Sequence, residues 1–120
     1  MNNSTIHIQV ANIIGDVYAV EAEEGQKVYG LVKKAFEENR KAILSFLNIE
    51  MMTTAFLNTA IGQLYKDFSE ENIRERLRVE NISEPGKVML KRVVDTAKLF
   101  YNEPENFQRM QQSINEILNQ

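Results

Sequence analysis

Hydroxyl and amide side chains gather in the middle of the chain, where they could bind an anion or accept a phosphate. Thr53 and Thr54 stand directly before a stretch with helical apolar spacing, and Asn58 lies one turn further along. Asn81 and Ser83 follow a later short apolar segment. If the apolar segments before these two groups are parallel strands, their carboxyl ends meet at one edge, where open α/β sheets tend to carry their sites. These five residues are therefore the candidate binding site.

The helix expected to begin at Thr54 has an uncompensated positive end. The first acidic side chain after Thr54 is Asp67, although Asp and Glu are favourable in the first turn of a helix. Backbone N–H groups at such an end can hold a phosphate or an acidic residue of a partner. Either Thr53 or Thr54 can cap this helix, and the alternative is that Thr54 only caps it and that Asn81 only caps a strand end.

Other kinds of chemistry have little support in the sequence. There is no cysteine and only one histidine, His7, so a thiolate nucleophile is excluded and a transition-metal site would have to be built from carboxylates. Neither a Gly-rich phosphate loop nor a Gly-x-Ser-x-Gly elbow occurs. The carboxylate pairs at 23–24, 37–38 and 70–71 fall on helix ends or exposed faces, as solubilising charges do. We expect a protein that is not an enzyme and holds no metal or cofactor.

Length and composition predict one folded domain over residues 1–120, because 120 residues can bury a core but are too few for two domains. The net charge is −3, and Lys and Arg are interleaved with Asp and Glu, which argues against nucleic acid as a partner. The chain shows no signal-peptide pattern and no apolar run long enough to cross a bilayer. Together with the lack of cysteine, this predicts a cytoplasmic protein without membrane contact.

Two hydrophobic periods alternate along the chain and predict an α/β fold, in which helices pack on a mixed sheet of about four strands. The strands are expected at 5–14, 17–20, 42–47 and 77–80, with the second pairing back on the first. The helices are expected at 23–39, 54–64, 70–77 and 84–102. The stripe that the second of these helices buries is expected to be Phe56, Leu57, Ala60, Ile61 and Leu64. Gly30 and Gly62 fall inside helices, and we expect close packing against the sheet at both.

The domain is expected to have its core over 5–102 and an extra C-terminal helix over 104–119. An apolar stripe runs along this last helix, formed by Phe107, Met110, Ile114, Ile117 and Leu118. The stripe can pack on its own domain or on a second copy, so a homodimer through this helix is one expectation.

The turn Thr53-Thr54-Ala55-Phe56 is followed by Leu57-Asn58, by Ile61-Gly62-Gln63-Leu64 and later by Val79-Glu80-Asn81-Ile82-Ser83. By this pattern the chain resembles the STAS-like domain family of unknown function, relatives of the anti-sigma factor antagonists. The resemblance covers somewhat more than half of the chain. It implies a single STAS-like α/β domain.

In anti-sigma factor antagonists the corresponding turn reads Asp-Ser-Ser/Thr-Gly, and its first serine accepts phosphate from a kinase that is also the binding partner. The resemblance places Thr54 at that hydroxyl, Thr53 at the Asp and Phe56 at the Gly. This chain therefore lacks the Asp and the Gly, which suggests a different partner surface. A phosphate on Thr54 would add a charge of about −1.5 to −2 there.

The resemblance implies a bacterial regulatory protein that binds another protein through the edge from Thr53 to Asn58, with Thr54 as the phosphorylation switch. Phe56, Asn81 and Ser83 complete the expected binding site. A histidine-kinase-type ATPase or another regulator is the implied partner. The alternative hypothesis is an α/β domain that uses the same helix start to bind a small anion or nucleotide, which predicts a concave pocket there.

Overall fold

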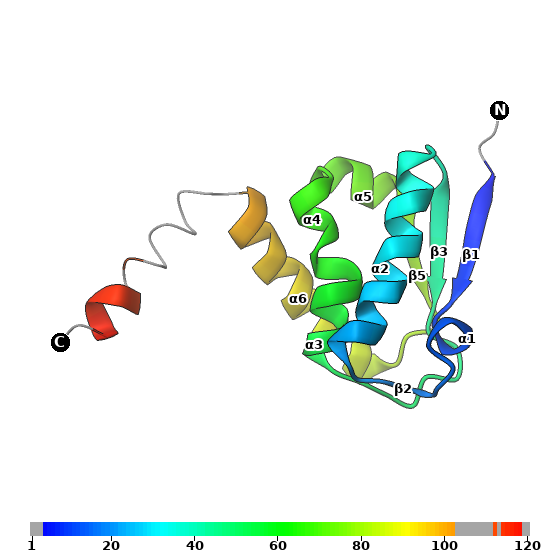
Figure 1. Ribbon diagram of the computed structural model, residues 1–120, viewed down its shortest axis with the longest axis horizontal. Coiled ribbons are helices and arrows are strands. Elements are labelled where there is room, and N and C mark those ends of the chain that lie inside the picture. Colours follow the sequence, from blue (N-terminus) through cyan, green and yellow to red (C-terminus); the bar gives the residue numbers. More distant parts are fainter. Residues whose placement is uncertain (1–3, 103–111, 113, 119–120) are drawn as a thin grey trace.

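The computed structural model describes residues 4–102, 112 and 114–118. Strands and helices alternate along them, which confirms the α/β class (Figure 1). The strands are β1 (Thr5–Gln9), β2 (Tyr18–Ala19), β3 (Lys41–Ser45), β4 (Met51–Met52) and β5 (Leu77–Glu80). The helices are α1 (Val10–Ile14), α2 (Ala22–Glu37), α3 (Thr54–Leu57), the π-helix η1 (Asn58–Gly62), α4 (Leu64–Asp67), α5 (Glu70–Arg76) and α6 (Glu84–Asn102). Most of the predicted C-terminal helix, including Phe107 and Met110, lies outside the described residues, whereas 112 and 114–118 are helical.

The strands of the described chain form two parallel sheets rather than one mixed sheet. The larger sheet has the order β1-β3-β5, and the smaller one pairs β2 with β4. In the larger sheet His7 lies beside Ile43, and Ile43 lies beside Arg78. In the smaller sheet Tyr18 lies beside Met51. The carboxyl ends of β1, β3 and β5 therefore meet at one edge, as the sequence suggested.

The first strand ends earlier than predicted. β1 stops at Gln9, and the residues after it form α1, which Gly15 closes in the left-handed conformation with φ of 69°. Val10, Ile13 and Ile14 also fit the i, i+3, i+4 spacing of one helical turn, so the pattern was ambiguous. Because α1 redirects the chain, β2 pairs with β4. The prediction that this segment pairs back on the first strand was wrong.

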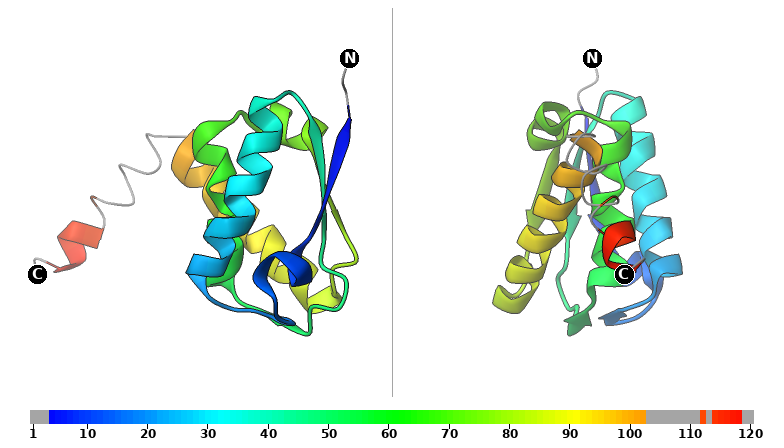
Figure 2. Two further views of the ribbon diagram at one scale, coloured as in Figure 1. Left: turned by 45° about the vertical axis from the view of Figure 1, so that its right-hand side comes forward. Right: turned by 90° about the vertical axis from the view of Figure 1, so that its left-hand side faces the viewer.

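The long helices lie on one face of the three-stranded sheet (Figure 2). Alternate strand residues such as Ile8, Ala42 and Leu44 are buried in the core on this side. Their neighbours Thr5, His7, Lys41 and Arg78 belong to the opposite, exposed set. Parallel sheets are usually covered on both faces, so this polar, uncovered face is an uncommon feature of the described domain.

The helices α3, η1 and α4 follow one another directly and carry the predicted apolar stripe. All five of its predicted members are buried, at 0% to 2% exposure: Phe56, Leu57, Ala60, Ile61 and Leu64. The five-residue π-helix at their centre was not predicted. Both α2 and α6 pack on it, as they also do on α3.

The expectation that Gly30 and Gly62 pack against the sheet was wrong. Gly62 faces α6, because a Cβ there would lie 3.4 Å from Val93 Cγ1. Gly30 is exposed, and a Cβ would meet no atom within 4 Å. The closest approach is at Gly25 of α2, where a Cβ would lie only 2.6 Å from the carbonyl oxygen of Phe56. This glycine lets α2 press directly against the backbone of α3.

Candidate functional site

Thr53 is the N-cap of α3, and its hydroxyl both donates and accepts a hydrogen bond. The Oγ1 atom accepts a hydrogen bond from the Phe56 N–H at 3.2 Å and donates one to the Val20 carbonyl at 2.6 Å. The Thr53 N–H also donates to the Ala19 carbonyl at 3.1 Å. Thr53 therefore ties the start of α3 to the segment around β2, and its side chain is a structural part of the site.

Thr54 is the hydroxyl that stays accessible. It is the first residue of α3 and is exposed, and its side chain makes no hydrogen bond to any residue that the structure describes. No acidic residue lies in the first turn of α3. Asn58 follows four residues later and is also exposed, so the two side chains share one face of the helical segment.

Phe56 lies inside the core. Its side chain is 0% exposed, so it cannot touch a partner directly. Its backbone is held between the Thr53 cap and the close approach of Gly25. Phe56 can act in this site only by fixing where the helix begins.

Asn81 and Ser83 hold the ends of neighbouring elements together. Asn81 has a φ of 58°, and its Nδ2 donates to Ser45 Oγ at 3.0 Å, which joins the carboxyl ends of β5 and β3. Ser83 caps α6 as predicted, because its Oγ accepts from the Gly86 N–H at 3.1 Å. A Cβ at Gly86 would lie 2.9 Å from the Cε of Met52, the residue before Thr53. The start of α6 and the threonine turn therefore lie at the same edge.

Two exposed apolar side chains that the sequence analysis missed lie beside these residues. Tyr18 is 50% exposed and Met51 is 53% exposed, and they are paired neighbours on β2 and β4. Met52 is buried, so β4 alternates between an outward and an inward side chain. This alternation was the available signal, but a two-residue strand is too short to show a period. We call Tyr18, Met51, Thr53, Thr54 and Asn58 the threonine edge.

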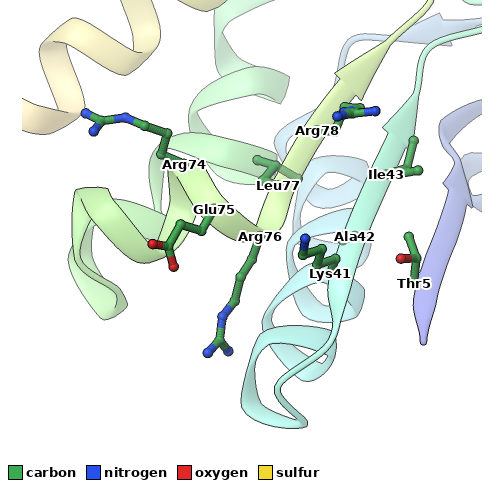
Figure 3. A pocket seen from close by; sticks show the side chains of 9 residues that line it. All are labelled: Thr5, Lys41, Ala42, Ile43, Arg74, Glu75, Arg76, Leu77 and Arg78. Atoms are coloured by element: carbon green, nitrogen blue, oxygen red, sulfur yellow. The ribbon is translucent and has the colours of Figure 1, made fainter. Parts of the chain in front are cut away.

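A cavity of about 280 Å³ lies at the opposite end of the larger sheet, where β3 and β5 begin (Figure 3). Its lining is formed by Thr5, Lys41, Ala42, Ile43, Arg74, Glu75, Arg76, Leu77 and Arg78. Lys41 and Arg78 form no ion pair with another described residue, whereas Arg76 donates to the Phe36 carbonyl at 3.1 Å, at the end of α2. This cavity contains none of the predicted site residues, but it gathers positive charge in a chain whose net charge is negative.

The strongest shift of a pKa in the described domain also lies away from the threonine edge. Burial, together with a hydrogen bond that Tyr29 donates to the Asp67 carboxylate, raises the pKa of Tyr29 to about 12. This contact joins α2 to α4. Among the described residues no cluster of His, Cys, Asp and Glu has the arrangement of a metal site. The described helices include none that is long and apolar enough to span a membrane.

Comparison with known families adds to this geometry. Residues 24–87, more than half of the chain, match the family described as STAS-like domain of unknown function (DUF4325). The chain belongs to this family. The matched part of the STAS-like domain runs from α2 to the first turn of α6 and includes all six residues of the predicted site. No curated protein and no solved structure matches the chain.

Proposed function

We propose that this STAS-like domain is a non-catalytic regulatory module that binds another protein through the threonine edge. The observation that carries the proposal is that the adjacent hydroxyls of Thr53 and Thr54 have different roles. Thr53 is fully engaged in holding the backbone, and Thr54 is left exposed at the first position of the helix. A partner or a modifying enzyme therefore meets one accessible threonine hydroxyl on a firmly held turn.

The composition of the threonine edge suits a protein partner. Tyr18 and Met51 supply adjacent exposed apolar surface, and tyrosine and methionine are enriched at protein interfaces. Thr54 and Asn58 supply polar groups at its rim. The backbone is held by bonds from Thr53 and Glu50 to the β2 segment, so little order has to be gained on binding.

Phosphorylation of Thr54 would switch this surface. The added charge of about −1.5 to −2 would stand at the positive end of α3, where no acidic side chain opposes it. The fold would accept the phosphate, while a partner that places acidic or apolar groups over Thr54 would be repelled. The family resemblance suggests a histidine-kinase-type ATPase or another cytoplasmic regulator as that partner.

The test is capture of partners from an extract of the source cell, with proteins identified by mass spectrometry. The baits are the wild-type chain, Thr54→Asp and the control Ser4→Asp, which adds the same charge at an exposed position before β1. A regulatory partner should be retained by the wild type and by Ser4→Asp but lost by Thr54→Asp. Calorimetry with the purified partner would then measure the change in affinity.

Two outcomes would contradict the proposal. Equal affinity of the wild type and Thr54→Asp for the partner would rule out the switch. Absence of any partner with all three baits would argue against a docking module and would favour the anion-binding alternative. Thermal-shift measurements with phosphate-bearing ligands would then test that alternative, since a bound ligand raises the melting temperature.

A further inference from the structure

The strand β5 is an open edge of the larger sheet. It pairs only with β3 among the described strands, and the Glu80 carbonyl faces β3 because it accepts from the Phe46 N–H at 3.0 Å. Backbone groups alternate in direction along a strand, so Val79 directs its N–H and its C=O outward. Neither group has a hydrogen-bond partner among the described residues. Such an edge is a ready template for another strand.

One face of this open edge is basic where β5 begins, and Glu80 lies further along the same face. Arg76 and Arg78 lie two residues apart, and both line the cavity where β3 and β5 begin, together with Lys41 of the neighbouring strand (Figure 3). Arg78 is exposed and forms no ion pair with a described residue. A strand added beside β5 would place the sheet-face side chains that lie at the beginning of β5 next to these cations.

The other face of the same edge is apolar. Leu77 and Val79 are only partly buried, and with Leu90 and Val94 of α6 they line a groove of about 250 Å³. Tyr65, Ile61 and Ile73 form further apolar parts of its lining. Its charged lining residues are Glu70, Arg74 and Lys98, and Glu70 forms ion pairs with both cations. The remaining side chains of an added strand would point into this groove.

We propose that β5 accepts an extended segment of a partner protein in which acidic residues alternate with apolar ones. Backbone hydrogen bonds to Val79 would supply affinity, and the two faces would supply specificity, as in other cases of strand addition. The charge of the site selects acidic side chains on the sheet face, and the groove selects apolar ones on the other. The site is separate from the threonine edge, so it stands whether or not Thr54 is a switch.

Two other occupants fit this edge less well. A second copy that paired its own β5 antiparallel here, with Val79 opposite Val79, would set Arg78 against Glu80 of the other copy but would leave Arg76 and Lys41 without an acidic neighbour. The phosphates of a nucleic acid could bind the arginines, but its charged backbone would not fill the apolar groove on the opposite face. Both remain as outcomes of the test.

The experiment measures binding of the full chain to a fluorescein-labelled peptide in which glutamate alternates with valine, by fluorescence anisotropy. A peptide of the same composition with glutamates and valines in separate blocks should bind about tenfold more weakly or worse, because it cannot satisfy both faces at once. Hydrogen exchange followed by NMR should show the Val79 amide becoming protected when the alternating peptide binds. This second measurement identifies the site independently of affinity.

Variants with matched controls test which residues of the β5 edge select the peptide. Arg78→Glu should weaken binding about tenfold and should prefer a peptide that alternates lysine with valine. Lys34→Glu, which makes the same charge change at an exposed position on α2, should bind as the wild type does. Val79→Pro removes the outward N–H, which edge strands tolerate, and should abolish binding while circular dichroism shows the fold retained.

The proposal is overturned if the block peptide binds equally well, if Arg78→Glu binds the acidic peptide unchanged, or if the Val79 amide gains no protection. Displacement of the peptide by a single-stranded oligonucleotide would assign the basic face to nucleic acid instead. Self-association in sedimentation that disappears in Val79→Pro would assign the edge to a second copy. The alternating peptide failing to bind at millimolar concentration would also exclude the site.

Discussion

The threonine edge and the β5 edge differ in which atoms they leave unsatisfied. At the threonine edge Thr53 holds the backbone, and of the two threonine hydroxyls that of Thr54 remains accessible. At β5 the side chains are long and charged or half-buried, and the backbone of Val79 remains open. The first edge therefore suits regulation at one atom, whereas the second suits recognition of an extended segment.

The two edges should also differ in how much of the core supports them. Phe56→Ala should lower the free energy of unfolding by about 3–5 kcal/mol, because a fully buried aromatic side chain is removed. Val79→Ala should cost only about 1 kcal/mol, because Val79 is partly exposed. Urea unfolding of both variants measures the difference, and equal losses would show that the two edges are supported alike.

Gly25 should be the backbone position on which the threonine edge depends. Gly25→Ala forces a Cβ against the Phe56 carbonyl and should cost about 1–3 kcal/mol. Gly30→Ala in the same helix is the control, because its Cβ meets no atom and alanine favours the helix by up to about 1 kcal/mol. Thermal unfolding should therefore move in opposite directions for the two variants. A shared direction would contradict the close approach of α2 to α3.

Replacing the two threonines should affect the stability of the domain differently, because only Thr53 caps the helix. Thr53→Ala removes the cap and should cost about 1 kcal/mol, whereas Thr54→Ala should change the unfolding free energy by less than about 0.5 kcal/mol. The sequence alone left either threonine as the cap. A larger loss for Thr54→Ala in chemical denaturation would reverse the assignment of cap and accessible hydroxyl.

Tyr29 lies on α2 beyond Gly25 and touches neither edge, so its effect is confined to alkaline pH. Its pKa in the folded chain, about 12, lies above the ordinary value of 10, so the folded state holds the proton more tightly. This contribution to stability is present below pH 10 and is lost as the pH rises from 10 towards 12. Tyr29→Phe should flatten this part of the stability profile in denaturant titrations. An unchanged alkaline slope would exclude Tyr29 as its source.

The sequence predicted those elements that are long enough to show a hydrophobic period. α2, β3 and β5 were placed to within a few residues, and the cap at Ser83 was identified by residue type before an apolar stripe. The strand predicted at 17–20 contains β2, but β2 and β4 have only two residues each and show no period, so Tyr18 and Met51 were missed as exposed neighbours. The open edge at β5 could not be predicted because it depends on strand order, which no local pattern contains.

The π-helix Asn58–Gly62 sets the rotation of α3, which carries Thr54, relative to α4 about their common helical axis. In a regular α-helix each residue advances the face by about 100°, so a wider turn delays every later side chain relative to the earlier ones. Here the delay lets Phe56 before it and Tyr65 after it both face the core while Thr54 stays outside. Deleting one residue within the π-helix would restore a regular helix, but it would rotate α4 against the start of α3. After this deletion, a segment oriented to bury Tyr65 would no longer keep Thr54 exposed to solvent.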